Sequence, residues 1–111
     1  TMSFSQITVQ DLAQSLNNPN IQFVDVREPW EVETASLPSF QNLPLSEFSE
    51  WSEQIYSKLD PETETLVLCH HGVRSAQMCN WLVQQGFTNV KNISGGIDAY
   101  SAIVDRSIPR Y

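Results

Sequence analysis

Apolar and polar positions alternate along the chain in short blocks that predict strands and helices in turn. Residues 21–26 are mostly apolar and β-branched and predict a strand, and residues 65–68 form a continuous apolar run that is typical of a strand buried on both faces. Residues 40–43 are a weaker strand candidate, and residues 90–93 are the last predicted strand. Apolar residues at helical spacing occupy residues 11–16, a short stretch from Pro29, and residues 46–59, 75–85 and 97–104. Strands that alternate with helices predict an α/β fold, in which helices cover both faces of a parallel sheet.

Short-range signals mark the ends of these blocks. Thr8 is a candidate N-cap for the first helix, and the proline at position 29 suits the first turn of the second. The pair Asp60-Pro61 ends the third predicted helix, and Gly86 is a candidate C-cap for the fourth.

The length and composition fit one domain. The chain has 111 residues, of which 41% are hydrophobic, and this is enough for a single core. No linker, repeat or low-complexity tract divides it, so residues 1–111 are predicted to form a single domain, with Thr1 set aside as a cloning remnant before Met2. We expect a monomer.

The charge balance bears on partners and location. Thirteen acidic against six basic residues give a net charge of −7, and we therefore expect neither nucleic acid nor an anionic membrane surface as a partner. No apolar run approaches the ~20 residues of a membrane-spanning helix, and the N-terminus carries no secretory signal. We expect a cytoplasmic protein whose cysteines, Cys69 and Cys79, are reduced thiols.

The segment CHHGVRS, residues 69–75, is the strongest candidate for chemistry. It follows the strand that ends at Leu68 and leads into a helix, and parallel α/β sheets bind ligands at the carboxyl ends of their strands. Backbone N–H groups, the helix dipole and the guanidinium of Arg74 would all favour a thiolate on Cys69, while Gly72 lets the backbone curl around the sulfur. These features predict a nucleophile beside an anion site; the alternative is a small buried cysteine at a strand end.

Three motifs, in this order along the chain, are similar to the signatures of the single-domain rhodanese family of sulfurtransferases. DVREPWE at 25–31 resembles the first signature, CHHGVRS at 69–75 the active-site loop, and NISGGIDAY at 92–100 the closing signature. Tyr100 stands where the family more often has tryptophan, and residues 34–39 lack a histidine and two glycines that are common there. The resemblance implies a rhodanese-like fold with a central parallel five-stranded sheet and helices on both faces.

The resemblance also implies a reaction and its residues. The Cys69 thiolate would take the outer sulfur of a small anionic donor such as thiosulfate, and the persulfide would pass it to cyanide, a thiol or a protein cysteine in ping-pong fashion. No cofactor is expected. The residues expected to bind the donor are His70, His71, Gly72, Val73 and Arg74, and the candidate supporting residues are Ser75, Asp25 and Arg27.

Two other classes of protein stay open. One is a small phosphatase or arsenate reductase, but the loop from Cys69 to Arg74 has six residues, the length that the rhodanese family uses for sulfur transfer, and related phosphatases have one more. The loop also contains no acid to protonate a leaving group. The other is a rhodanese-shaped binding or sulfur-carrier module without turnover; non-catalytic relatives usually lack the cysteine, which this chain keeps.

The histidines and the second cysteine each allow two interpretations. His70 and His71 join Cys69 as zinc-type ligands by residue type, but three consecutive residues do not converge on one ion, so no metal is expected. The histidines either tune the charge of the loop or are exposed side chains. Cys79 lies on the apolar face of its helix, which favours a buried core residue over a resolving thiol.

Two further sites near strand ends are predicted to be structural. Asp25 and Arg27 lie at a strand end, and Arg27 could meet a donor anion. A structural network is favoured, in which Glu28 and Glu31 are the salt-bridge partners of Arg27. The pair Gly95-Gly96 lacks the spacing of a nucleotide-binding loop and predicts a tight strand-to-helix turn.

Overall fold

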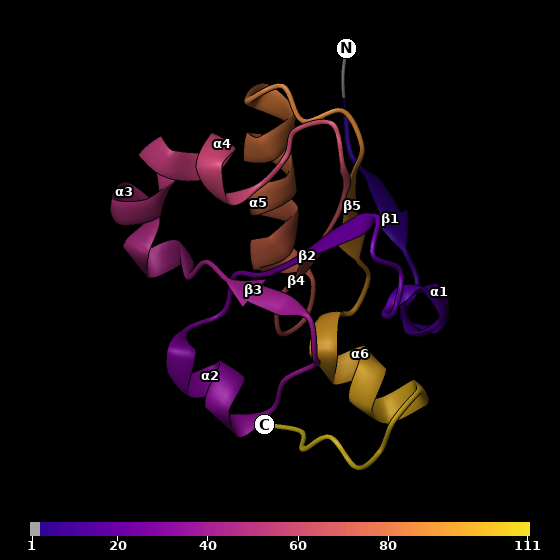
Figure 1. The fold of residues 1–111 in the computed structure, drawn as a ribbon. Helices are drawn as coiled ribbons and strands as arrows, with labels where there is room; N and C mark the ends of the chain where they lie inside the picture. The colour runs from indigo at the N-terminus through magenta and orange to yellow at the C-terminus, as the bar shows by residue number, and fades with distance from the viewer. Residues whose placement is uncertain (1–2) are drawn as a thin grey trace.

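Five parallel strands form one sheet at the centre of the molecule (Figure 1). The computed structural model describes residues 3–111, so Thr1 and its interpretation as a cloning remnant lie outside the described residues. The strands stand in the order β1-β5-β4-β2-β3, with bounds Ser5–Ile7 (β1), Ile21–Asp25 (β2), Phe40–Asn42 (β3), Glu64–Leu68 (β4) and Val90–Ile93 (β5). The predicted parallel five-stranded sheet is confirmed, with the apolar strand β4 at its centre.

Helices cover both faces of the sheet, as predicted. Figure 1 shows α3, α4 and α5 on one side, α1 and α6 on the other, and α2 below the sheet in that view. Their bounds are Val9–Ser15 (α1), Pro29–Thr34 (α2), Phe48–Trp51 (α3), Ile55–Lys58 (α4), Val73–Gln84 (α5) and Gly96–Ile103 (α6). None of the helices between residues 3 and 111 is long and apolar enough to cross a membrane.

The alternation of side chains along β4 divides the core into two clusters. Leu66 and Leu68 pack in the cluster that includes residues of α1 and α6, whereas Val67 and Cys69 pack with residues of α3, α4 and α5. Because neighbouring residues of a strand face opposite sides, a continuous apolar run serves both faces. The same alternation places the side chain of Cys69 on the α5 side.

The first strand was not predicted by an apolar run. Residues 5–7 have the sequence Ser-Gln-Ile, with a single apolar residue, and within the described part of the chain they pair only with β5, at the edge of the sheet. An edge strand of this length carries too little burial to produce a pattern, so its presence depends on pairing with a distant segment.

The continuous helix predicted over residues 46–59 is wrong. Two short α-helices, α3 and α4, alternate there with the 3-10 turns Leu45–Glu47 (η1) and Ser52–Gln54 (η2). The N–H of Phe48 donates to the carbonyl of Leu45, and the N–H of Ile55 donates to that of Ser52, so the backbone tightens at both points. The apolar spacing was right about which side chains are buried, but it does not determine the continuity of the backbone.

The predicted start of the helix after the loop also needs correction. The helix predicted over 75–85 is α5, which begins at Val73 and ends at Gln84. Val73 and Arg74 therefore belong to its first turn, and the loop proper covers only residues 69–72.

Candidate active site

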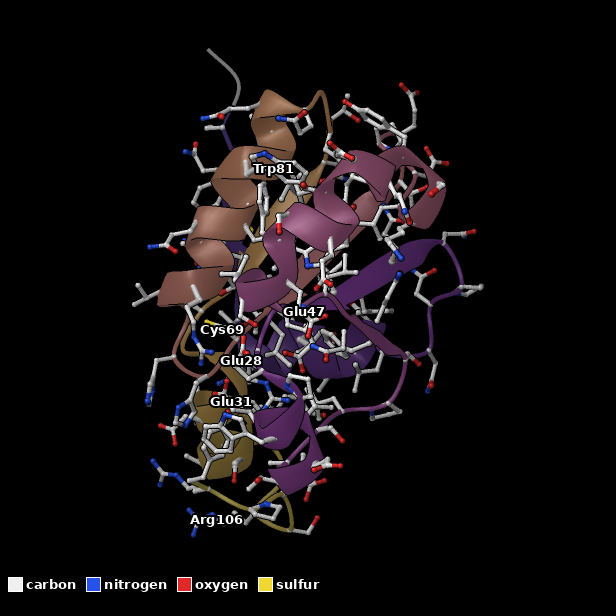
Figure 2. All side chains as sticks on the ribbon, turned by 90° about the vertical axis from the view of Figure 1, so that its left-hand side faces the viewer. Glu28, Glu31, Glu47, Cys69, Trp81 and Arg106 are labelled. Atoms are coloured by element: carbon white, nitrogen blue, oxygen red, sulfur yellow. The ribbon has the colours of Figure 1, made fainter. Side chains whose placement is uncertain are left out.

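The predicted nucleophile lies at the carboxyl end of the central strand. Cys69 follows β4, and β2 ends level with it, since Asp25 is in register with Leu68. The N–H of Val26 donates to the carbonyl oxygen of Leu68 at 3.0 Å, which continues the pairing beyond the two strands. Figure 2 shows Cys69 at this edge, with Glu28 and Glu31 below it in that view. This is the edge at which parallel α/β sheets bind ligands.

The Cys69 sulfur lies inside the loop and close to the start of α5. The backbone N–H of Gly72 donates to Sγ at 3.0 Å, and the Ser75 hydroxyl oxygen lies 3.2 Å from Sγ. Gly72 has a φ of 103°, a left-handed conformation that favours glycine. Cys69 is 1% exposed, and its sulfur lies beside the N-terminus of a 12-residue helix, whose dipole favours negative charge. The geometry fits the predicted nucleophile, and its reactivity stays a prediction.

The turn between β5 and α6 holds the loop in place. The N–H of Ile97 donates to the carbonyl of Cys69 at 3.0 Å, and the N–H of Asp98 donates to that of His70 at 3.1 Å. Gly95 and Gly96 make the turn with φ values of 77° and 62°. The predicted tight turn is confirmed, and the first N–H groups of α6 are used by loop carbonyls.

Gly96 is the position at which this turn tolerates least change. A Cβ atom there would lie 2.4 Å from the carbonyl oxygen of His70 and 2.5 Å from that of Cys69. Since overpacking costs ~1–3 kcal/mol beyond any backbone strain, we expect Gly96→Ala to destabilise the fold and displace the loop. Denaturant unfolding measures the first effect, and the alkylation rate of Cys69 measures the second.

Gly86 offers a matched control for this substitution. It has a φ of 94°, also left-handed, but a Cβ atom there meets nothing within 4 Å. Gly86→Ala therefore carries the backbone strain alone, ~1–2 kcal/mol, and should leave the Cys69 alkylation rate unchanged. Equal losses of stability in the two variants would contradict the proposed close packing of the turn against the loop.

Arg74, predicted to bind the donor, forms a two-bond ion pair with Glu31 of α2. The distances are 2.7 Å from Nη1 to Oε2 and 2.8 Å from Nη2 to Oε1. The hydrogen bond from Arg74 lowers the pKa of Glu31 to about 2 and raises the pKa of Arg74. Glu31 therefore stabilises the fold above its ordinary pKa of 4.5, and this contribution is lost as the pH falls toward about 2. Much of the charge of Arg74 is compensated before a donor binds, so its role in binding stays a prediction.

Glu31 is a central residue of the site that the sequence did not identify as one. It forms a capping box at the start of α2, in which its side chain accepts from the N–H of Glu28 at 2.9 Å. Its Oε1 also accepts from the hydroxyl of Tyr111 at 2.9 Å. The available sequence signal was a glutamate three residues after Glu28 in a helix that begins with proline, which predicts a cap but not the partner Arg74.

Arg27 lies in a buried network, as predicted, but its salt-bridge partner is Asp25 and the partners predicted for it are wrong. Arg27 is 0% exposed and bonds Asp25 through Nε at 3.0 Å and Nη2 at 2.7 Å, whereas the carboxylates of Glu28 and Glu31 bond other residues. Its remaining bonds go to the carbonyls of Glu31 and Ala35 and to the Tyr111 hydroxyl. Burial lowers the pKa of Arg27, but the hydrogen bonds and charges of Asp25 and Tyr111 together outweigh this effect and raise the pKa. Every guanidinium nitrogen is engaged, which assigns Arg27 a structural role.

The two histidines have different surroundings. The His70 ring stacks on Tyr111, with centroids 3.9 Å apart and planes at 6°, and also lies 3.9 Å from the His71 ring. Burial, together with the charge of His71, lowers the pKa of His70. His71 is exposed, and its Nδ1 lies 3.8 Å from the Asp98 carboxylate. Between residues 3 and 111, no three His, Cys, Asp or Glu side chains form a group that could hold a metal ion. Binding of a donor by either histidine stays a prediction.

Cys79 is a buried core residue, as predicted. It is 0% exposed, and burial together with the charge of Cys69 raises its pKa to about 12. Both cysteines are free thiols. A thiol that stays protonated at neutral pH is a poor candidate for a resolving role.

A second residue that the sequence did not single out, Asn92 of β5, lies behind the loop. It is 3% exposed, accepts a hydrogen bond from the Ser75 hydroxyl and donates to the carbonyl of Gly72 at 3.1 Å. The sequence offered only a weak signal, a polar residue in a predicted strand beside the apolar Ile93, because buried polar groups need partners.

The fold and this site together define a class: parallel α/β domains in which a cysteine at the tip of the central strand is enclosed by a short loop and a helix N-terminus. Comparison with known proteins gives the family within that class. The family model of the rhodanese-like domain matches residues 8–103. The chain belongs to the rhodanese-like domain family.

Three relatives show the range of this similarity. The chain is 51% identical over 109 residues to the Arabidopsis thaliana protein "Rhodanese-like/PpiC domain-containing protein 12, chloroplastic", covering 95% of this chain but only 36% of that protein. It is 30% identical over 101 residues to the thiosulfate sulfurtransferase GlpE of Coxiella burnetii, covering 91% of each. The crystal structure of a rhodanese-related protein from Thermoplasma volcanium has a TM-score of 0.75 and 30% identity, covering 89% of this chain and 92% of that one. The sulfurtransferase relatives and the fold agree with the family assignment.

Proposed function

We propose that this domain is a sulfurtransferase that carries a sulfane sulfur as a persulfide on Cys69. The donor is a small anion of the thiosulfate type, and the acceptor is a thiophile such as cyanide, a thiol or a protein cysteine. The observation that carries the proposal is the position of the Cys69 sulfur, 3.0 Å from the donating N–H of Gly72 and beside the N-terminus of α5. Both features favour negative charge at or next to this sulfur.

The proposed reaction has two displacements that balance in atoms and charge. The Cys69 thiolate attacks the outer sulfur of thiosulfate; the S–S bond of the donor breaks, its electron pair leaves with sulfite, and a persulfide anion remains on the cysteine. Cyanide then attacks the outer sulfur of the persulfide, thiocyanate leaves, and the Cys69 thiolate is restored. The N–H groups of the loop stabilise the anionic intermediate.

The ion pair of Arg74 favours this reaction over phosphate hydrolysis. A phosphatase needs a guanidinium whose N–H groups are free for the phosphate oxygens, and an acid to protonate the leaving group. In this chain Nη1 and Nη2 of Arg74 are both bonded to Glu31, and Glu31 is held ionised by that pair. Sulfur transfer needs an anion site only for the attacking thiolate, and the backbone N–H of Gly72 donates to its Sγ.

Intact-mass measurement after thiosulfate treatment tests the proposal directly. We expect a gain of one sulfur, ~32 Da, on Cys69, which cyanide removes, because the persulfide is the covalent intermediate of the two displacements. Peptide mapping should place the sulfur on Cys69 and none on Cys79, whose thiol is buried and protonated. Absence of the adduct under conditions in which the chain is folded would contradict the proposal and support a binding module.

A further inference from the structure

A chain of buried hydrogen bonds leads from the Cys69 sulfur to Asn92. Sγ lies 3.2 Å from the hydroxyl oxygen of Ser75, and that hydroxyl is bonded to Oδ1 of Asn92. Ser75 is 0% exposed and Asn92 is 3% exposed, so water does not compete for these groups. The direction of each of these hydrogen bonds therefore depends on the protein atoms alone.

The direction of every bond in the chain follows from atoms that can only accept. The carbonyl oxygen of Gly72 has no hydrogen, so the group of Asn92 that lies 3.1 Å from it must be the amide NH₂. The other end of that amide, Oδ1, therefore faces Ser75, and because it too can only accept, the Ser75 hydroxyl donates to it. A hydroxyl has one hydrogen, so the remaining contact with Cys69 uses the thiol as donor and the Ser75 oxygen as acceptor.

We infer that Asn92 is a positioning residue that acts through Ser75: it turns the Ser75 hydroxyl away from Cys69 and thereby keeps the proton on the resting thiol. If Cys69 loses its proton in this arrangement, the anionic sulfur faces a lone pair of Ser75. The hydroxyl can turn to donate to the sulfur, but Oδ1 of Asn92 is then left buried without a donor. Either way, ionisation at Sγ costs one hydrogen bond.

The repulsion between Sγ and the Ser75 lone pair acts on the thiolate and not on the persulfide, an argument that rests on the proposed function. In the persulfide the negative charge lies on the outer sulfur, and Sγ is a neutral divalent atom. Ser75 then keeps its bond to Asn92 without facing an anion. The orientation of Ser75 that Asn92 imposes therefore disfavours the free thiolate relative to the persulfide.

Other charged and titratable groups near Cys69 act independently of the hydrogen bonds that join Cys69, Ser75 and Asn92. Arg74, in the first turn of α5, carries charge of the sign that favours the thiolate, but it is bonded to Glu31 of α2. Cys79 of α5 is protonated at neutral pH, and His70 follows Cys69 in the loop. The substitutions below leave Arg74, Glu31 and His70 in place. Cys79 is replaced in every variant that is compared.

The test is a double-mutant cycle in a Cys79→Ala background, where Cys69 is the one remaining thiol. The variants are Asn92→Val, Ser75→Ala and the two combined, and the measurement is the rate of alkylation by neutral iodoacetamide as a function of pH. Asn92→Val frees the Ser75 hydroxyl to donate to the sulfur, so we expect the pH midpoint to fall by about one pH unit, the equivalent of one net hydrogen bond. With Ser75→Ala present, Asn92→Val should produce less than a third of that shift.

The outcomes distinguish an effect of Asn92 that passes through the Ser75 hydroxyl from an effect of Asn92 on the shape of the loop. Asn92 also donates to Gly72, and a midpoint that shifts equally with and without Ser75 would overturn the inference by showing that Asn92 acts through the loop. Gln6→Ala is the control, because Gln6 accepts from the amide NH₂ of Asn92 at 3.2 Å and does not contact the Ser75 side of that amide; its midpoint should not move. Asn92→Asp keeps an acceptor for Ser75 and should not lower the midpoint, and a lowered value would also overturn the inference.

This experiment is separate from the test of the proposed function. The pH dependence of alkylation by iodoacetamide reports how readily Cys69 loses its proton, and it needs no sulfur donor. A missing persulfide adduct together with a non-additive double-mutant cycle would reject the proposed sulfurtransferase and keep the role of Asn92. A persulfide adduct together with an additive cycle would reject only the role of Asn92.

Discussion

Replacing Cys69 by serine is expected to abolish sulfur transfer from thiosulfate to cyanide. The reaction needs a thiolate that can bind a second sulfur atom. A serine hydroxyl at the same position in the loop stays protonated and forms no such bond. Loss of a covalent nucleophile lowers kcat by several orders of magnitude, and we expect at least a ~10³-fold loss, down to the uncatalysed background. Thiocyanate formation measures the rate. Circular dichroism and the denaturation midpoint should be close to those of the unsubstituted chain, because the side chains have nearly the same shape.

Cys79→Ala is the matched control for this experiment. Cys79 is 0% exposed, and burial together with the charge of Cys69 raises its pKa to about 12, so it is expected to contribute packing but no chemistry. This variant should lose some stability and keep its turnover. Turnover that survives Cys69→Ser, or that disappears with Cys79→Ala in a folded protein, would contradict the assignment of the nucleophile.

The sequence was sufficient to locate the loop because its signals are local. A strand that ends at Leu68, a cysteine, a glycine and a helix follow each other within a few residues, and the topology of parallel sheets supplies the edge at which they meet. The turn at Gly95-Gly96 was predicted for the same reason. Both are confirmed by hydrogen bonds that join the loop to the start of α6.

The partners of the loop were not predictable because they come from distant parts of the chain. Glu31 lies 43 residues before Arg74, and Asn92 lies 17 residues after Ser75. Nothing near Glu31 distinguishes Arg74 from Arg27 as its partner, and the nearer arginine was the natural expectation. Only the sheet order, which places β2 and β5 on either side of β4, brings these side chains to one edge.

The elements that the sequence missed share a weak dependence on local propensity. The edge strand β1 has one apolar residue and one neighbouring strand. The segment from Leu45 to Lys58 has a helical spacing of buried residues but a backbone that tightens twice. In both cases packing against the rest of the domain decides the backbone, and a single sequence does not contain that information.

Replacing Arg27 by methionine is expected to be the most destabilising of the substitutions considered. The guanidinium is 0% exposed and its nitrogens bond Asp25, two backbone carbonyls and the Tyr111 hydroxyl. Methionine fills much of the same space but leaves the Asp25 carboxylate, itself 2% exposed, without its counterion. Breaking a buried ion pair from one side costs ~3–5 kcal/mol, a large share of the ~5–15 kcal/mol that stabilises a domain. Denaturant unfolding followed by circular dichroism measures the loss.

The double variant Asp25→Leu/Arg27→Met separates charge from connectivity. If the unpaired Asp25 carboxylate causes most of the loss, removing it together with the arginine should recover most of the lost stability. Replacing a buried ion pair by apolar residues often changes the free energy of unfolding very little. If the double variant is as unstable as Arg27→Met, the bonds from Arg27 to the carbonyls of Glu31 and Ala35 stabilise the fold and the charge pair does not. A loss below ~1 kcal/mol for Arg27→Met alone would contradict both explanations, since unpaired buried charges are among the few mechanisms with larger effects. We expect recovery, because among residues 3–111 the Asp25 carboxylate keeps only the N–H of residue 27, at 3.1 Å, as a partner once the guanidinium is gone.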